Sequence, residues 1–517
     1  MEMQNFAPVM FAGLIVIMLI GFPVAFSLAA LGLGCGFFAI QMGWFPAQYM
    51  SNLPLAMFSI LSNDLLLAIP FFTFMGTILE KCGLAEDMLD SMGQLFGPVK
   101  GGLGYSVIIV GFILGAITGT VAGQVIAMAL ISLPVMIRYG YNMRYATGVL
   151  AASGTITQLV PPSLVLVVLA DQLGKPVGDM YKGAWGPSLI QIALFALYTY
   201  ALGVWKPHHI PGVPREARTL DGWALWKKCL KGIVPSAVLI FTVLGSMGGL
   251  PFQSSAVATP TEAGAMGVVG AMILAAMHKR LTKDLLWEAM HGTMRLTAMV
   301  VFILIGSRVF SQVFQGVDGA VWVEHLLTGL PGGQVGFLVV VNIFVFFLAF
   351  FLDFFEIAFI IVPMLAPVAA KLGIDLVWFG VILCVNLQTS FMHPPFGFAL
   401  FYLRGIADTL FKEKRIPVAV QSNDIYLGSI PWVIMQIMLV LIVIFIPQTV
   451  TVFLDKEIVV DLDKVKIEMP ADETKVDPAS LLTNGQPDAA KEAASGAASE
   501  KQSADDDQKA LDALMKK

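Results

Sequence analysis

Two pairs of adjacent prolines, Pro161-Pro162 and Pro394-Pro395, interrupt apolar stretches of the sequence. Because proline lacks an N–H and its ring clashes with the preceding helical turn, each pair predicts a broken helix. The carbonyl groups upstream of each break lose their partners, which costs several kcal/mol per group in hydrocarbon unless other groups replace them. Hydroxyl and amide side chains precede each pair and offer such replacements: Ser153, Thr155 and Thr157 in the first stretch, and Asn386, Gln388, Thr389 and Ser390 in the second.

These groups suit a hard cation, which prefers oxygen ligands. Broken helices of secondary transporters coordinate Na⁺ through unwound carbonyl groups. The alternative is a pair of proline kinks whose free carbonyls are satisfied by back-bonding hydroxyls. Because the arrangement occurs twice, the sequence favours two cation sites over two kinks.

Asp353 and Glu356 lie inside another strongly apolar stretch. Carboxylates within a membrane are costly and usually functional. Since they would repel an anionic substrate, we expect them to coordinate a cation, cap a half-helix or pair with Arg308; a hydrated position near the outer surface is the alternative. Arg308 itself suits either a substrate carboxylate or a snorkelling position at the interface. We expect His393 to be a packed histidine rather than a proton carrier.

The composition places these residues in a membrane. The chain of 517 residues is 57% hydrophobic and only 13% charged, whereas a soluble domain carries about 25% charged residues. This excludes a soluble enzyme, a nucleic-acid-binding protein and a secreted disulfide scaffold. The four cysteines are far apart and form no CxxC motif, so no disulfide framework or zinc site is expected. The N-terminal stretch lacks a basic region and a cleavage site, so we expect it to stay in the mature protein.

Apolar stretches long enough to cross a membrane recur along the chain. Two more, at 101–138 and 335–372, are broken near the middle, so that each half is too short for a full crossing. We expect each to form a helical hairpin that enters and leaves on one side; two ordinary spans joined by a tight turn are the alternative. The expected spans are 6–20, 24–41, 60–79, 145–170, 187–205, 233–250, 263–278, 294–314, 377–402 and 428–449.

Basic residues indicate the orientation. They cluster in the loops near residues 81–100, 138–144, 206–231, 279–295 and 404–415, whereas 312–370 contains no Lys or Arg. If the basic loops are cytoplasmic, the first hairpin opens inward and the second outward, and both ends of the chain lie outside. Trp223, Trp226, Lys227 and Lys228 suggest an amphipathic interfacial helix.

The two halves also resemble each other in sequence. One constant shift along the chain places Pro134 on Pro367, Gly140 on Gly373 and Pro161-Pro162 on Pro394-Pro395. Hairpins that open to opposite sides and repeat in sequence indicate an inverted repeat. This is typical of a secondary transporter with its site near the membrane midplane.

Several motifs, taken in order, resemble one transporter family. The stretches 67–72 (LAIPFF), 260–265 (PTEAGA), 386–390 (NLQTS) and 394–397 (PPFG) are similar to those of the large membrane subunit of tripartite ATP-independent periplasmic (TRAP) transporters. The resemblance covers about residues 6 to 450. The run 396–405 looks most like the branch often labelled mannitol/chloroaromatic, whose members are associated with small carboxylates.

The resemblance implies a periplasmic solute-binding protein and a small four-helix membrane subunit as partners, a Na⁺ gradient as the driving force, no other cofactor, and an elevator movement against a scaffold. It implies cation contacts at Thr118, Gly119, Thr120, Ser153, Gly154, Thr155, Asp353, Asn386, Gln388 and Thr389. Contacts with an organic anion are expected at Thr157, Pro162, Ser390, Pro395 and Arg308. His393, Arg308 and the long acidic tail depart from the family pattern.

The sequence therefore predicts an all-α polytopic membrane protein with an inverted-repeat, elevator-type fold, two re-entrant hairpins and two broken helices. We expect it in the bacterial inner membrane as a Na⁺-coupled importer subunit for a small carboxylate, for example a 2-oxo or 2-hydroxy acid. The predicted parts are 1–79 (scaffold or arm helices), 80–186 (first transport repeat), 187–314 (central scaffold, with a basic loop at 206–232), 315–427 (second repeat), 428–454 (last helix) and 455–517 (acidic tail of disordered composition).

Three other functions can be weighed against the sequence. The first is a self-sufficient cation- or proton-coupled dicarboxylate carrier of a related superfamily, which would need no binding protein. A membrane-embedded hydrolase would need clustered metal ligands such as HExxH, and the chain contains no such motif. A channel is the third. The lack of a GxxxxGK[ST] motif argues against an ATP-driven pump.

Overall fold

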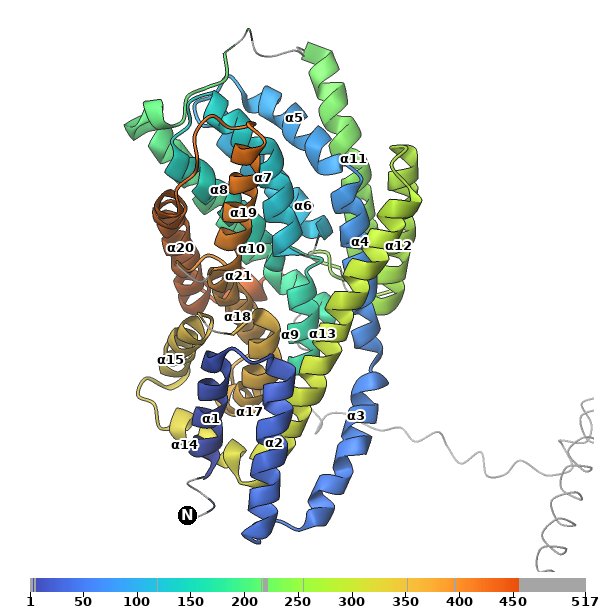
Figure 1. The fold of residues 1–517 in the computed structure, drawn as a ribbon, viewed down its shortest axis with the longest axis vertical. Coiled ribbons are helices and arrows are strands. Elements are labelled where there is room, and N and C mark those ends of the chain that lie inside the picture. The colour runs from blue at the N-terminus through green and yellow to red at the C-terminus, as the bar shows by residue number, and fades with distance from the viewer. Residues whose placement is uncertain are drawn as a thin grey trace, which may run out of the picture. The chain divides into compact units, whose positions relative to one another are not determined.

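The chain folds into helices, as shown by a computed structural model (Figure 1). The structure describes residue 3 and residues 6–118, 120–214, 216, 222–253, 255–350, 352–394 and 397–454. Eight helices in this part of the chain are long and apolar enough to cross a membrane, and two bent pairs bring the number to ten. The fold is therefore all-α and polytopic, as the composition predicts.

The helices of the first half run as follows: α1 (Phe6–Ile20), α2 (Val24–Gln41), η2 (Ala47–Asn52), α3 (Leu53–Leu61), α4 (Asp64–Lys81), α5 (Leu84–Phe96), α6 (Gly102–Thr118), α7 (Val121–Arg138), α8 (Met143–Thr155), η3 (Ile156–Gln158), α9 (Leu164–Leu173), α10 (Val177–Trp205) and η4 (Pro207–His209). Those of the second half are α11 (Gly222–Ser246), α12 (Pro260–Met277), α13 (Lys283–Gly316), α14 (Gly319–Thr328), α15 (Gly333–Leu348), α16 (Phe354–Glu356), the π-helix η6 (Ile357–Ile361), α17 (Val362–Lys371), α18 (Leu376–Ser390), α19 (Phe398–Lys412), α20 (Ser422–Phe445) and α21 (Gln448–Thr451).

Both predicted hairpins are present, but the expectation that each half is too short to cross was wrong for their returning arms, because Val121–Arg138 and Phe354–Lys371 are among the eight helices long and apolar enough to cross a membrane. The first consists of α6 and α7, which pack against each other, and the second of α15 followed by α16, η6 and α17. The open end of the first lies in the upper part of Figure 1 and that of the second in the lower half, near α14. The shift that superimposes the two proline pairs also places the start of the first returning helix, Val121, on that of the second, Phe354. It likewise places the last residue of the first, Arg138, on that of the second, Lys371, so the repeat predicted from sequence is a repeat of structure.

Both predicted broken helices are present as well. In the first, α8 passes through η3 into an irregular segment with a cis bond between Pro161 and Pro162, and α9 follows. In the second, α18 ends at Ser390 and α19 begins at Phe398. The helices before the breaks, α8 and α18, begin at equivalent positions of the repeat, because the same shift places Met143 on Leu376.

Several helix boundaries differ from the predicted spans. The span expected at 60–79 is α4, which begins at Asp64 and follows α3 after a bend of 45°. Asn63 sets this start, because its side chain accepts a hydrogen bond from the Leu65 N–H. The spans expected from 187, 233 and 294 each begin about three turns earlier, at Val177, Gly222 and Lys283. Polar residues at these ends obscure the apolar pattern without stopping the helix.

Trp223, Trp226, Lys227 and Lys228 therefore belong to the first turns of α11, which continues without interruption to Ser246. The separate interfacial helix expected from these residues is not formed, and this interpretation was wrong. Trp223 and Trp226 are exposed. Aromatic side chains of this kind at the end of a spanning helix fit the interfacial belt.

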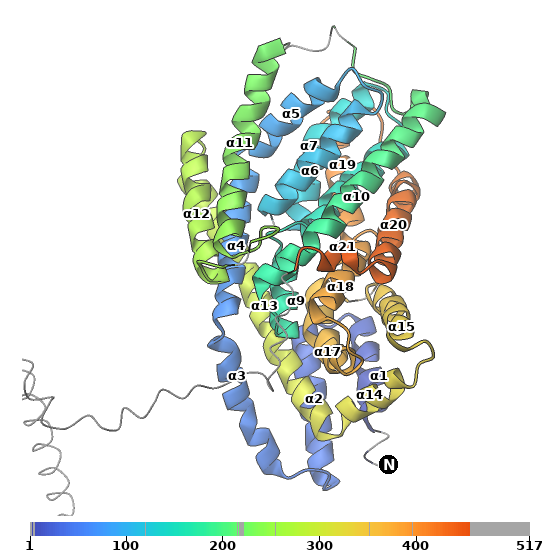
Figure 2. The same cartoon turned by 180° about the vertical axis from the view of Figure 1, so that it is seen from behind.

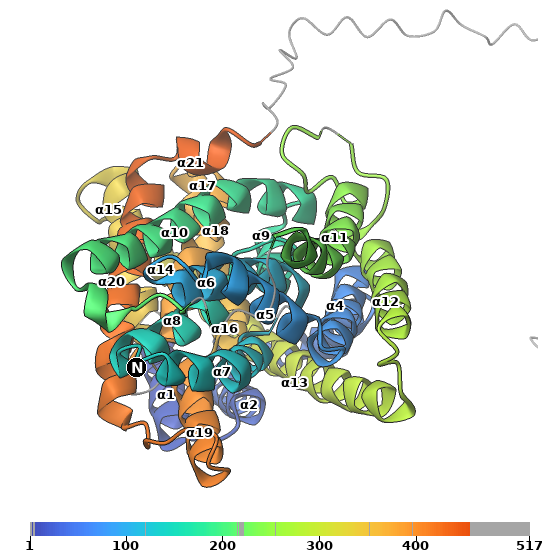
Figure 3. The same cartoon turned by 90° about the horizontal axis from the view of Figure 1, so that it is seen from above.

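The helices pack into two groups. On one side α4 packs against α12 and α13, α13 packs against α2, and α11 packs against α12. On the other, α10 packs against α6, α9, α18 and α20, and Figure 2 shows α10 running past α18 and α20. Viewed along the long axis, α11 to α13 and α20 lie on opposite sides of the hairpins and broken helices (Figure 3). Which helices move together stays a prediction.

The basic loops gather at one end. The segments after α5, α7, α10 and α19 and the turn before α13 lie at the upper end of Figure 1, whereas α1 begins at the lower end. This grouping is what the orientation argument requires, because a cytoplasmic excess of Lys and Arg needs these loops on one side.

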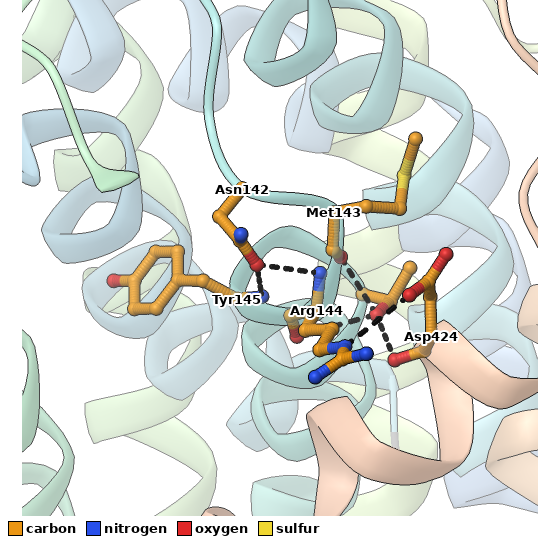
Figure 4. A network of polar contacts seen from close by, with 6 residues as sticks. Asn142, Met143, Arg144, Tyr145 and Asp424 are labelled. Atoms are coloured by element: carbon orange, nitrogen blue, oxygen red, sulfur yellow. Dashed lines mark hydrogen bonds and ion pairs between the residues drawn. The ribbon is translucent and has the colours of Figure 1, made fainter. Parts of the chain in front are cut away.

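The start of the first broken helix is fixed by a polar network at this end (Figure 4). The Asn142 side chain accepts hydrogen bonds from the backbone N–H groups of Arg144, at 3.0 Å, and Tyr145, at 3.4 Å. Arg144 Nε donates to Asp424 of α20 at 3.3 Å. The network joins the starts of α8 and α20, so α20 braces the helix that carries the first predicted cation residues.

Candidate functional site at the broken helices

The first hairpin carries three predicted cation residues at its tip. Gly119 lies outside the described residues, as does the side chain of Thr118. Thr120 occupies the N-cap position of α7 in an extended conformation, and its side chain makes no capping hydrogen bond. The hydroxyl of Thr120 is therefore not committed to the helix end.

Ser153 lies against this hairpin. Its side chain is buried, and its hydroxyl oxygen has no hydrogen-bond partner among the described residues. Its backbone oxygen accepts a hydrogen bond of 2.8 Å from Gln124 Nε2 on α7, which also donates to the Gly111 oxygen on α6 at 2.6 Å. Gln124 thus ties both helices of the hairpin to α8. An unpartnered buried oxygen beside this amide is a suitable cation ligand.

The neighbouring residues Gly154 and Thr155 are also buried. A Cβ atom at Gly154 would lie 2.2 Å from Val125 Cγ2, so glycine allows α7 to approach α8 closely. Thr155 Oγ1 donates to the Ala152 oxygen at 2.9 Å and accepts from Gln436 Nε2 of α20 at 2.9 Å.

Thr157, expected to contact substrate, donates its hydroxyl to the Gly154 oxygen at 2.9 Å. Pro162 is buried in the irregular segment before α9. Ser163 follows it, donates to the Gln158 oxygen and caps α9 by accepting from the Val165 N–H at 3.1 Å. The back-bonding alternative therefore holds for several hydroxyl protons, although each hydroxyl oxygen keeps lone pairs for another partner.

The second broken helix meets its hairpin in a similar way. Asn386 is the counterpart of Ser153 in the repeat, and its Nδ2 donates to the Asn342 oxygen of α15 at 2.8 Å. Thr389 and Ser390 donate to the oxygens of Asn386 and Leu387, each at 2.6 Å. Asn342 Oδ1 is buried without a partner. Each repeat therefore joins hairpin and broken helix through one amide-to-carbonyl bond at the predicted site.

Gln388 faces α10 instead of the hairpin. Its Oε1 accepts a hydrogen bond of 2.6 Å from Gln191 Nε2, and both side chains are buried. The side-chain oxygen of Gln388 is therefore already bonded to Gln191. This makes Gln388 the weakest of the predicted cation ligands.

Of the roles considered for Asp353 and Glu356, the structure shows helix capping. The Phe354 N–H donates to Asp353 Oδ1 at 2.7 Å, and the Asp353 N–H donates to Glu356 Oε2 at 2.9 Å. The two residues form a capping box at the start of α16. Within the part of the chain that the structure describes, Arg308 forms no ion pair with either carboxylate, so that expected pairing was wrong.

Arg308 lies elsewhere. Its side chain is exposed and lines a cavity of about 320 Å³ together with Asn63, Asp171, Ser311 and Gln315. α3, α4, α9, α13, α14 and the second hairpin contribute to its walls. Of the described residues expected to contact substrate, Arg308 alone lines this cavity. The structure therefore does not bring Arg308 together with Thr157, Pro162 and Ser390, and Pro395 lies outside the described residues.

His393 is buried at the second break, where its ring packs against the rings of Phe346 and Phe350. The ring centroids lie 4.2 Å and 4.3 Å apart, respectively. Neither ring nitrogen has a hydrogen-bond partner. His393 is therefore a packed histidine in this structure, as expected.

Sequence reasoning missed the amides that organise the site: Gln124, Gln191, Asn342 and Gln436. Each is a buried amide residue with mostly apolar neighbours in its helix. Burying an amide is costly unless it is hydrogen-bonded, so their presence in membrane helices is the signal that could have identified them. Groups of three or more His, Cys, Asp or Glu side chains able to hold a metal are absent from the described residues.

The two hairpins, the two broken helices and the repeat that relates them define a membrane transport protein of the inverted-repeat class. The sequence profile of the "Tripartite ATP-independent periplasmic transporter, DctM component" matches residues 11–449. The chain belongs to this family and is the large permease component of a TRAP transporter, a multi-pass protein of the inner membrane and not an enzyme.

Named relatives support this assignment. The chain is 28% identical to the C4-dicarboxylate TRAP transporter large permease protein DctM of Rhodobacter capsulatus, over 85% of this chain and 97% of that protein. It is 25% identical to the 2,3-diketo-L-gulonate TRAP transporter large permease protein YiaN of Escherichia coli K12, over 83% and 95%. It is also 25% identical to the isethionate TRAP transporter permease protein DctMQ of Oleidesulfovibrio alaskensis, over 78% and 61%.

A solved structure shares the fold. The YdaH transporter of Alcanivorax borkumensis superposes with a TM-score of 0.53 at 14% sequence identity, over 77% of this chain and 87% of that one. At this identity the likeness concerns the fold alone.

Proposed function

We propose that this subunit carries a small organic anion into the cell together with Na⁺. The observation that carries the proposal is the repeated junction of hairpin and broken helix. In the first repeat Gln124 Nε2 lies 2.8 Å from the Ser153 oxygen, and in the second Asn386 Nδ2 lies 2.8 Å from the Asn342 oxygen. Each junction gathers buried oxygen atoms, including the unpartnered Ser153 Oγ and Asn342 Oδ1. Hard cations prefer such ligands.

The first junction is the stronger candidate for Na⁺. It combines Thr120, whose side chain does not cap its helix, with Ser153, Gly154 and Thr155 on the facing helix. In the second, Asn386, Thr389 and Asp353 offer oxygen atoms, whereas Gln388 Oε1 is held by Gln191. We propose Na⁺ as the only coupling cofactor, held at these junctions.

We propose a small carboxylate, such as a 2-oxo or 2-hydroxy acid, as the substrate class. The relatives are named for a C4-dicarboxylate, 2,3-diketo-L-gulonate and isethionate, all of which are organic anions. Substrate would lie near Thr157, Pro162 and Ser390, beside the cation that compensates its charge. Arg308, in its separate cavity, would meet the anion at another stage of its passage.

We propose two protein partners, a periplasmic solute-binding protein that delivers the anion and a small four-helix membrane subunit that braces this one. The family is described as tripartite, which requires two components besides this chain. In the proposed elevator movement, the hairpins and broken helices shift together against α2, α4 and α11 to α13.

Uptake by proteoliposomes tests this proposal. Vesicles that contain this chain and the small subunit should accumulate the labelled anion only when the binding protein is outside and a Na⁺ gradient points inward. Vesicles with the gradient dissipated serve as the control. Uptake without any binding protein would instead favour the self-sufficient carrier, and uptake that ignores the Na⁺ gradient would contradict the coupling.

A further inference from the structure

A carboxyl group from α4 lies against the tip region of the first hairpin. Glu80, the next-to-last residue of α4, points to Gly123 of α7: a Cβ atom built at Gly123 would lie only 2.0 Å from Glu80 Oε2 and 2.7 Å from Oε1. The neighbouring Lys81 pairs with Glu288 instead. In the described part of the chain, no basic side chain forms an ion pair with Glu80. The carboxyl group of Glu80 thus fills the space that the missing side chain of Gly123 leaves.

Gly123 is the third residue of α7, in the turn whose N–H groups have no partner within the helix. An acidic group is favourable there, because the positive end of the helix dipole lies at the N-terminus. Thr120, at the N-cap, makes no side-chain hydrogen bond to this turn. Among the described residues of the hairpin, the N-cap residue of α7 therefore does not cap the helix with its side chain.

The second hairpin shows what the first lacks. Under the shift that relates the two repeats, Asp353 corresponds to Thr120 and Glu356 to Gly123. Asp353 and Glu356 form the capping box that holds the start of α16. The second hairpin supplies a carboxyl group at its third position from its own chain segment, whereas in the first hairpin this position is glycine and the carboxyl group comes from α4.

The first turn of α7 also leads directly to the proposed cation site. Gln124 follows Gly123, and its Nε2 holds the Ser153 oxygen at 2.8 Å and the Gly111 oxygen at 2.6 Å. A change in the position of this turn therefore moves the amide that orients Ser153. Glu80 is linked to Ser153 through only two consecutive residues of α7.

We propose that Glu80 is a positioning residue: it supplies from α4 the carboxyl group that the first hairpin lacks at its third helical position, and the proposed first cation site is ordered only while α7 lies against α4. This inference rests on the proposed function for its connection to Na⁺. The contact between Glu80 and the hairpin tip does not depend on that function.

Hydrogen–deuterium exchange of the full-length protein in nanodiscs tests the contact. In Glu80→Ala, amides of residues 120–126 should exchange about fivefold faster, the ratio that corresponds to ~1 kcal/mol of lost interaction between the carboxyl group and the helix dipole. Amides of residues 353–359, in the second hairpin, should be unchanged. Glu288→Ala is the matched control, because Glu288 pairs with Lys81 near the same end of α4.

A second variant moves the carboxyl group into the hairpin. Glu80→Ala combined with Gly123→Glu copies the arrangement of the second hairpin, and exchange of residues 120–126 should return close to that of the unmodified protein. Glu80→Gln, which keeps the side-chain volume, guards against misfolding and should accelerate exchange in the same direction. Unchanged exchange in both single variants, or a double variant as fast as Glu80→Ala, would overturn the proposal.

Transport separates this inference from the proposed function. In Glu80→Ala the Na⁺ concentration for half-maximal uptake should rise, whereas in Glu288→Ala it should not. Faster exchange with unchanged Na⁺ dependence would leave the Glu80 contact standing but would overturn its proposed connection to the cation site.

Discussion

At the scale of single residues, the structure separates groups that hold the fold from groups left for a ligand. Thr155, Thr157, Thr389 and Ser390 all donate their hydroxyl protons to carbonyl groups of the preceding turn. Ser153 is different, because its buried hydroxyl has no partner. A ligand at the first junction can therefore bind the Ser153 hydroxyl oxygen without breaking an existing hydrogen bond.

This difference makes Ser153 the sharpest test of the proposed Na⁺ site. Ser153→Ala should leave thermal stability nearly unchanged but raise the Na⁺ concentration for half-maximal uptake about tenfold, since one lost ligand of ~1.4 kcal/mol corresponds to a factor of ten. Asn386→Ala should raise it as well and also lower stability, because the bond to Asn342 is lost.

Na⁺ titrations of uptake in proteoliposomes provide the measurement. Ser51→Ala is the control, because Ser51 is exposed and its hydroxyl donates to the backbone oxygen of Gln48, three residues earlier. If Ser153→Ala and Ser51→Ala show the same Na⁺ dependence, Ser153 is not a ligand.

At the scale of helices, the close packing of α20 against α8 holds the first broken helix in place. A Cβ atom at Gly148 would lie 2.2 Å from the Gly428 oxygen, and one at Gly428 would lie 2.2 Å from the Arg144 oxygen. Small residues at helix crossings in membranes allow the backbones to touch, and packing then replaces the hydrophobic driving force that lipid does not provide. The polar network of Arg144 and Asp424 lies at the same crossing.

Gly148→Ala should therefore lower the melting temperature, because the new methyl group meets backbone atoms that cannot rotate away. Overpacking of this kind costs about 1–3 kcal/mol. Gly292→Ala is the matched control, since Gly292 also lies inside a helix but a Cβ atom there would have nothing within 4 Å. Thermal unfolding in detergent measures both variants, and equal melting temperatures would contradict this account of the crossing.

At the scale of the whole molecule, the two repeats open toward opposite ends of the long axis. Arg138 and Lys371 mark this relation, because they are the last residues of α7 and α17, are both exposed and occupy equivalent positions of the repeat. If the repeats are inverted across the bilayer, these two positions face different compartments.

Cysteine labelling in cells measures this directly. In a background without the four native cysteines, Arg138→Cys should react with an impermeant maleimide only after the inner membrane is permeabilised, whereas Lys371→Cys should react without it. Both variants replace an exposed basic residue with cysteine, so each is a control for the other. Labelling of both from the same side would refute the inverted arrangement, and with it the basis of the proposed transport cycle.

The sequence by itself determined the all-helical membrane fold, the two hairpins, the two breaks and the repeat. These follow from local rules: apolar length, double prolines and the recurrence of residue types at a fixed distance. Helix capping was one of several roles that the sequence left open for Asp353, and the structure shows it as the capping box with Glu356.

Only the tertiary structure decided which polar groups meet. Gln124 reaches Ser153, Gln191 engages Gln388, and Glu80 lies against Gly123 because helices distant in the chain pack side by side. The same packing places Arg308 in a cavity apart from the broken helices. A pattern along one helix shows that a polar residue needs a partner, but the partner lies across an interface whose geometry depends on the packing of many side chains at once.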